Sequence, residues 1–217
     1  MAADTLPSIA SALLAGAVTA AQVALGAAVI AFGLGLALAL VNVFTPLRLV
    51  RVAIGAYIEW MRNVPALAHL FVLYFGLASV GIRFSPKAAA IVGLGLVGAA
   101  VLCDVFSAGL RALHAGQREA ALAVGLTPAQ ALRFVVLPQV MRLTLPSIGN
   151  YATQLIKDTS IASAIAAPEI MFYARSLVTS TFQTPLIYAS AIALYASIVF
   201  PVGWMFSRLE RRLGVGR

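Results

Sequence analysis

Charged side chains are almost absent from five long intervals of this chain, and that absence limits what it can fold into. No Asp, Glu, Lys or Arg occurs in residues 5–47, 63–82 or 176–207, and few occur in 88–110 and 143–168. A transmembrane helix needs about 20 mostly apolar residues, so each interval is long enough to cross a bilayer. Apolar residues make up 62% of the 217 residues and charged residues 10%, against about 45–50% and about 25% in soluble domains. These features predict an all-α integral membrane protein and exclude a soluble enzyme or a disordered chain.

The interval boundaries predict one transmembrane domain over residues 1–217 with five spans. The expected spans are about 18–42, 60–82, 88–110, 146–168 and 185–207. We expect a short peripheral helix over 6–16 before the first span, and two spans within 5–47 are the alternative. Proline lacks the amide donor of a helix interior, so Pro146 is expected to begin the fourth span.

The basic residues indicate how the spans are oriented. Cytoplasmic loops of membrane proteins carry an excess of Lys and Arg. One set of connections holds eleven cations: Arg48, Arg51, Arg62, Arg111, Arg118, Arg133, Arg142, Arg208, Arg211, Arg212 and Arg217. The opposite set holds only Arg83, Lys87 and Arg175. The sequence therefore predicts an external N-terminus and a cytoplasmic C-terminus, and its net charge of +8 does not indicate nucleic-acid binding because the cations flank apolar segments.

The predicted cytoplasmic loop over 111–143 is the longest connection and has its own helical pattern. Residues 118–124 are mostly strong helix formers, and Gly125 lies where a helix C-terminus often adopts a left-handed conformation. Thr127 followed by Pro128 is typical of a helix N-terminus, and Leu137-Pro138 is expected to end that second helix. The loop is either a docking element for a partner or a solvated hairpin that only joins two spans.

Several motifs resemble those of one family of membrane proteins. Glu119-Ala120-Ala121, Gly125 and Leu137-Pro138 resemble the EAA loop of ABC importer permeases. Five further segments resemble the polar amino acid uptake family within that class. They are Tyr57 to Pro65, Tyr74-Phe75-Gly76, Leu145 to Asn150, Lys157-Asp158-Thr159-Ser160 and Pro168-Glu169. The resemblance covers about 18–210 and implies the type I importer permease fold with five transmembrane helices.

The resemblance also implies function and partners. It implies a permease subunit that moves polar amino acids across the bacterial inner membrane, beside a second permease copy or a sister permease. Two ABC ATPase subunits would dock on the EAA loop, and a periplasmic solute-binding protein would deliver substrate. The chain has no G-x-x-x-x-G-K-[ST] motif, no set of catalytic residues and no metal-ligand spacing. We therefore expect no enzyme activity and no cofactor in this chain, with ATP bound by the partner subunits.

One glycine pattern matches a nucleotide-binding motif by its spacing alone. Gly93-Leu94-Gly95-Leu96-Val97-Gly98 fits G-x-G-x-x-G, but a dinucleotide site requires a soluble strand–turn–helix unit. Small residues within a span allow helices to approach closely, so these glycines are predicted to serve helix packing.

Ionisable residues within the predicted spans or at their ends are the candidates for a translocation path or gate, because an unpaired charge at membrane depth is costly. The candidates are Glu59, Arg62, His69, Asp104, Lys157 and Asp158, together with the hydroxyls of Thr159 and Ser160. Lys157 and Asp158 are adjacent, so they point in different directions on a helix and each needs another partner or an aqueous cavity. Their alternative is a buried ionic network that holds a dimer together.

Three smaller expectations concern single residues. Glu59 and Arg62 are three apart and can pair on one helix face. His69 either contacts substrate or forms a hydrogen bond that supports packing. Glu169 and Arg175 either contact the binding protein or are solvated loop charges.

Two other classes of function remain open at this point. An ion-coupled secondary transporter working alone is one, although such proteins often contain inverted repeats and none is visible here. A structural subunit of a membrane complex is the other, and it would keep the docking loop without needing charges inside the spans.

Overall fold

The computed structural model describes residues 5–113 and 115–214, all in helices and short connections. The ends of the predicted 1–217 domain, including Arg217, lie outside these residues. The main helices are α1 (Thr5–Phe44), α2 (Arg48–Asn63), α3 (Ala66–Phe71), α4 (Leu77–Ser79), α5 (Pro86–Ala112), α6 (Ala115–Ala123), α7 (Pro128–Ala131), α8 (Leu137–Asp158), α9 (Ile170–Thr181) and α10 (Thr184–Arg212). Short segments of other helix types are η1 (Val72–Gly76), η2 (Leu132–Val136) and η3 (Thr159–Ile165).

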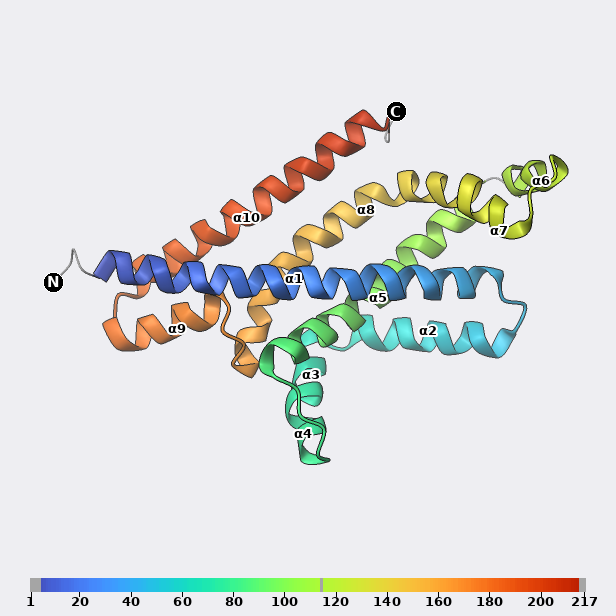
Figure 1. Ribbon diagram of the computed structural model, residues 1–217. Helices are drawn as coiled ribbons and strands as arrows, with labels where there is room; N and C mark the ends of the chain where they lie inside the picture. The colour runs from blue at the N-terminus through green and yellow to red at the C-terminus, as the bar shows by residue number, and fades with distance from the viewer. Residues whose placement is uncertain (1–4, 114, 215–217) are drawn as a thin grey trace.

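The longest helices run roughly along one direction of the molecule (Figure 1). The α1–α2 connection, α6 and α7 lie at one end, and α10 runs toward that same end. The start of α1 and α9 lie at the other end. The segments predicted to be cytoplasmic are therefore grouped at one end of the protein.

Helices α1 and α5 form the most extensive contact in the structure. A Cβ built on Gly35 would lie 2.9 Å from Leu102 Cβ, and one on Gly95 would lie 2.8 Å from Ile30 Cβ. Gly93, Gly95 and Gly98 are all buried in α5. The prediction that the glycine pattern serves helix packing is confirmed, because side chains at these positions would force the helices apart.

The first predicted span is longer than expected. A single α-helix runs from Thr5 to Phe44 over 40 residues, so the separate peripheral helix over 6–16 and the alternative of two spans are both wrong. This segment has no internal break because it has no charged residue, and proline occurs only at Pro7, in the first turn, where a missing amide donor costs little.

The predicted second span over 60–82 is bent rather than straight. The segments Arg48–Asn63 and Ala66–Ser79 meet at an angle of 102°. Pro65 causes the break, because the residue before a proline is disfavoured in a helical conformation; Val64 is extended, with φ −96° and ψ 134°.

The fourth span begins earlier than Pro146, and its helix continues through Pro138 and Pro146. Helix α7, η2 and α8 follow one another without interruption from Pro128 to Asp158. Neither Leu137-Pro138 nor Pro146 marks a helix boundary, so both expectations are wrong. The π-helical segment η2 precedes Pro138, and the amide of Leu137 bonds to the carbonyl of Leu132. This wider turn accommodates the ring of Pro138, which an ordinary turn would place against a carbonyl four residues earlier.

Among the described residues, four helices are long and apolar enough to cross a membrane, and the bent pair of α2 with α3–α4 makes five possible spans. This agrees with the predicted all-α membrane fold. Helix α9 lies between the last two spans and packs on α1 and α10.

Candidate functional site: an exposed helical loop and a polar membrane face

The loop after α5 folds into two short helices joined by a tight turn. Gly125 has φ +90°, a conformation that costs a residue with a side chain about 1–2 kcal/mol. The amide of Leu126 bonds to the carbonyl of Ala121 at 3.1 Å, and the amide of Gly125 bonds to the carbonyl of Leu122 at 3.0 Å. These are the bonds of a glycine-terminated helix, so the predicted role of Gly125 in the turn is confirmed.

The second helix of the loop begins with a capping box. The amide of Gln130 donates to Thr127 Oγ1 at 3.3 Å, and the amide of Thr127 donates to Gln130 Oε1 at 2.8 Å. Pro128 occupies the first turn, as predicted. Two reciprocal bonds at a helix start stabilise the turn, so the loop presents a defined shape.

The residues of the EAA motif do not all face outward. Glu119 and Ala120 are exposed, whereas Ala121 is only 5% exposed and packs within this chain. Ala121 packs against its own chain, and its place in the ATPase-docking motif stays a prediction. Glu119 and Ala120 remain available to a partner.

A polar stripe runs along the exposed face of α8. Ser147, Asn150 and Gln154 are exposed, and half-buried Asp158 follows at helical spacing. Gln154 Nε2 donates to Asp158 Oδ1 at 2.8 Å. Ser147, Asn150 and Gln154 were not predicted from the sequence, although their spacing of three and four residues is the signal that reveals the stripe. The stripe is unusual because the exposed positions of α1 and α10 are largely apolar.

The three polar residues close to Asp158 in sequence, Lys157, Thr159 and Ser160, differ in exposure and in hydrogen bonding. Lys157 is exposed and forms no ion pair within the described part of the chain, so the prediction that it does not pair with Asp158 is confirmed. The hydroxyl of buried Thr159 donates to Ile156 O at 2.7 Å, and that of Ser160 donates to Lys157 O at 2.7 Å. The side-chain hydroxyls of both residues are therefore bonded to their own helix.

Asp104 extends the polar face onto α5. It lines a groove with Ala108, Thr144 and Ser147. Arg62 Nη1 donates to Asp104 Oδ2 at 2.5 Å, and the two side chains are 47% and 54% exposed. This is the one ion pair among residues 5–113 and 115–214. It joins α2, just before its bend, to α5.

The expected Glu59–Arg62 pair is therefore wrong. Asn63 Nδ2 donates to Glu59 Oε2 at 2.7 Å, while Arg62 binds Asp104. The sequence could not reveal this, because Asp104 is 42 residues from Arg62 and only the packing of α2 on α5 brings them together.

His69 lies in α3 beside the bend. Both ring nitrogens are buried and without a hydrogen-bond partner in the structure, so the expected packing hydrogen bond is absent. The ring borders an apolar cavity of about 250 Å³ whose walls include Trp60, Val64 and Gly93. The structure places His69 apart from the stripe on α8.

Glu169 differs from both of its predicted alternatives, because it is fully buried. Its carboxylate accepts bonds from the amides of Met171 at 2.9 Å and Phe172 at 2.8 Å, and from the hydroxyl of Tyr195 at 2.5 Å. Burial raises the pKa of the Glu169 carboxyl above its ordinary range, although these donors oppose the shift. It caps α9 and is neither a solvated charge nor a surface contact. Arg175 donates to the carbonyl of Ser163 at 2.7 Å.

These features define a class of protein. Apolar helices form the body, a polar stripe runs along α8 beside Asp104 of α5, and an ordered helical loop extends from one end. Such a combination is typical of a polytopic membrane protein that moves a polar solute and is coupled to a partner outside the membrane.

The chain belongs to the family described as the inner membrane component of binding-protein-dependent transport systems, which matches residues 31–215. It is 33% identical over 184 residues to the probable glutamine ABC transporter permease protein GlnM of Bacillus subtilis, covering 84% of each protein. It is 30% identical over 161 residues to the glutamine transport system permease protein GlnP of Escherichia coli, covering 73% of this chain and 74% of that one.

Solved structures agree with this assignment. The crystal structure of an amino acid ABC transporter with histidines matches with a TM-score of 0.86 and 26% identity, over 96% of this chain and 97% of that chain. An inward-facing structure of the MetNI methionine ABC transporter matches with a TM-score of 0.78 at 19% identity, over 93% and 95% of the two chains, which supports the fold alone. The predicted family and the importer permease fold are confirmed. The protein is a multi-pass membrane subunit of an ATP-driven importer, located in the bacterial inner membrane, and members of this family work with a separate ATPase and a solute-binding protein.

Proposed function

We propose that this permease moves polar amino acids, with the polar face of α5 and α8 lining their path. The observation that carries the proposal is the exposed stripe of Ser147, Asn150, Gln154 and Asp158 beside Asp104. Polar and charged groups are disfavoured against lipid, so this face borders water, substrate or another subunit. A path for zwitterionic solutes has the same requirement. The names of the relatives support an amino acid as the solute.

The working unit in this proposal is a permease dimer, built from two copies or from this chain and a sister subunit. Each polar face contributes to a shared path between the subunits. The N-terminus lies outside and the C-terminus in the cytoplasm, since the cation-rich connections are grouped at one end (Figure 1).

The exposed face of α6 docks on the ATPase. Glu119 meets a basic group there and Ala120 allows close approach, while the turn at Gly125 fixes the angle of α6. Closure of the ATPase dimer on ATP then moves the two loops, and rigid-body rocking opens the path alternately to each side.

Reconstitution into proteoliposomes with the ATPase and the binding protein tests the substrate. Glutamine, cystine, arginine and glutamate are supplied singly, and both uptake and stimulated ATP hydrolysis are measured. Uphill uptake that needs ATP supports the proposal. Uptake by the permease without an ATPase contradicts it and favours a secondary transporter.

Charge exchange at the loop tests docking. Glu119→Lys is expected to reduce co-purification of the ATPase at least tenfold, because a favourable ionic contact becomes repulsive. The matched change Glu59→Lys lies on α2, away from the loop, and is expected to leave co-purification unchanged. Normal ATPase binding by the Glu119 variant would contradict this docking face.

A further inference from the structure

Helix α6 is weakly attached to the body of the protein. Its extensive backbone contacts within the described chain are with its own loop, η2 and α7. Two pockets of about 330 and 460 Å³, both open to solvent, lie between α6 and the ends of α1 and α5. Because open pockets replace the close packing of a protein interior there, α6 has room to shift.

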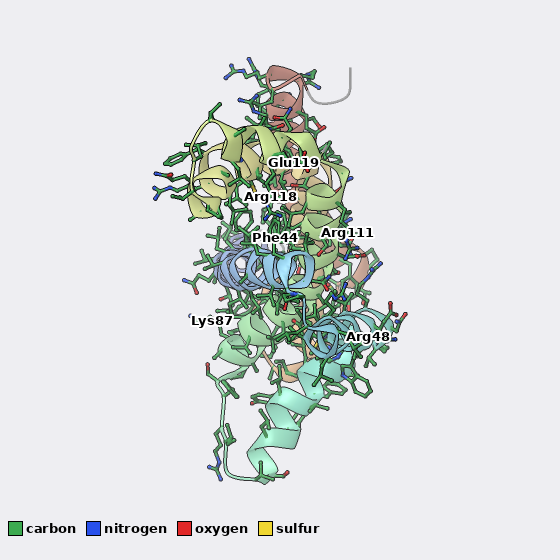
Figure 2. All side chains as sticks on the ribbon, turned by 90° about the vertical axis from the view of Figure 1, so that its right-hand side faces the viewer. Phe44, Arg48, Lys87, Arg111, Arg118 and Glu119 are labelled. Carbon is green, nitrogen blue, oxygen red and sulfur yellow. The ribbon has the colours of Figure 1, made fainter. Side chains whose placement is uncertain are left out.

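Phe44, Arg118 and Val136 line both pockets, and Phe44 and Arg118 also contact each other. The Arg118 guanidinium lies over the Phe44 ring, 5.6 Å from its centre. Figure 2 shows Arg118 between Phe44 and Glu119 at this end of the molecule. Arg118 forms no ion pair within the part of the chain that the structure describes.

The two partners come from helices of very different length and packing. Phe44 is the last residue of α1, a 40-residue helix packed along α5. Arg118 belongs to a helix of nine residues. A cation over an aromatic ring is attracted by the ring's negative face, so this contact holds a short helix against a long, extensively packed one.

We infer that Arg118 is a positioning residue that seats the docking helix on the end of α1. The inference rests on the proposed docking of α6 and goes beyond it, because it adds a second route for the movement of the loop. One route runs through η2 into α8 along continuous helix. The other runs through Arg118 and Phe44 into α1, which carries no residue of the docking motif.

The strength of the Arg118–Phe44 cation–π contact suits a helix that must be held in place and released again. A cation–π contact near the surface biases an equilibrium between seated and unseated positions by about twofold to thirtyfold. That bias is large enough to favour the seated position and small enough to be reversed during each transport cycle. Glu119, next in sequence, is exposed and is the residue proposed to meet the ATPase, so in this scheme Arg118 and Glu119 hold α6 to different bodies.

Hydrogen exchange of the permease alone in lipid nanodiscs tests the seating. Phe44→Leu and Arg118→Gln are expected to increase amide exchange in residues 116–124 by about twofold to thirtyfold, matching the bias lost. The double variant is expected to show no further increase, and Arg118→Lys, which keeps the cation, is expected to restore most protection. Unchanged exchange in both single variants would overturn the inference.

A matched control removes the same kind of contact elsewhere. Arg208 lies over Trp204 at 5.0 Å within α10, so Arg208→Gln deletes a cation–π contact that joins no separate elements. This variant is expected to leave exchange in α6 unchanged. An equal increase in α6 would show that the effect is general and would overturn the inference.

The second measurement uses the complex with its ATPase and a non-hydrolysable ATP analogue. In the wild type, the analogue is expected to change amide exchange at residues 40–44 of α1 and at the start of α8. Arg118→Gln is expected to retain the ATPase and the response in α8 but to lose the response in α1. A full α1 response in this variant would overturn the second route, whereas failure of the wild type to bind the ATPase would contradict the proposed docking instead.

Discussion

Two carboxylates in this protein, Glu169 and Asp104, lie in opposite surroundings. Glu169 is buried between α1, α9 and α10 and accepts three hydrogen bonds from its own chain. Asp104 is half exposed, has one partner in Arg62, and borders an open groove. In a membrane protein, a fully satisfied and enclosed charge contributes to structure, whereas an exposed and partly satisfied charge is available for a solute or another subunit. The contrast separates a rigid end of the molecule from a working face.

The largest expected effect follows from removing the buried carboxylate. Glu169→Ala leaves two helix amides and the Tyr195 hydroxyl without their acceptor, and we expect a loss of about 3 kcal/mol in the free energy of unfolding. Thermal unfolding in detergent measures it. Asp104→Ala is the control on the working face, with an expected loss of about 1 kcal/mol or less because the pair is half exposed. Equal losses of unfolding free energy in the Glu169 and Asp104 variants would contradict the structural difference between the two carboxylates.

The next effect concerns how closely α1 approaches α9 near Glu169. A Cβ on Gly16 would lie 2.8 Å from backbone atoms of Glu169 and Ile170, whereas one on Gly55 would meet nothing within 4 Å. Gly16→Ala is expected to destabilise the protein by about 1–3 kcal/mol through overpacking. Gly55→Ala is expected to be neutral or to stabilise α2 by up to about 1 kcal/mol. Comparison of unfolding temperatures in one detergent checks this, and similar values for the two variants would show that α1 and α9 are not fixed against each other.

A functional effect is expected at the working face with little change in stability. Asp104→Asn removes the charge that binds Arg62, and we expect uptake in proteoliposomes to fall about fivefold or more, since conformational coupling commonly amounts to about 1–3 kcal/mol. The exchanged pair Arg62→Asp with Asp104→Arg is expected to recover part of the uptake. Unfolding temperatures identify any variant that has simply lost its fold. Normal uptake by the Asn variant would show that the exposed pair is dispensable.

The smallest expected effect is a pH dependence confined to the rigid end. Burial raises the pKa of Glu169, so the folded protein binds this proton more tightly than the unfolded chain does. The stabilisation from Glu169 is therefore complete below the ordinary pKa of about 4.3 and is lost as pH rises through the raised value. Relative to Glu169→Gln, the wild type should lose stability as the pH increases from about 4. A difference in unfolding temperature that stays constant between pH 4 and 8 would contradict this.

Prediction from the sequence succeeded where the cause was local. Absence of charge located the apolar helices, Gly125 and Thr127 located the turn and the start of α7, and the motif residues identified the family. It failed at Pro138 and Pro146, because a proline stops a helix only when the structure cannot widen or bend the preceding turn. The π-helical segment Leu132–Val136 provides that widening at Pro138, and nothing in its residue types reveals it.

The candidate site was only partly predictable for a related reason. Asp104, Asp158 and Arg62 were recognisable because charges inside apolar spans are rare. Their partners were not recognisable, since Asp104 binds Arg62 across two helices and Asp158 binds Gln154 within one. The burial of Ala121 and Glu169 was not predictable, because sequence gives residue type, while burial depends on which element packs on each residue.

The amino-acid sequence by itself determined that this is a helical integral membrane protein and that its basic connections lie on one side of the membrane. Hydrophobicity, charge and turn preference act over a few residues, so they can be read along the chain. Only the tertiary structure decided which charges are enclosed and which are open, and that Phe44 meets Arg118, because those relations arise when helices distant in sequence pack together.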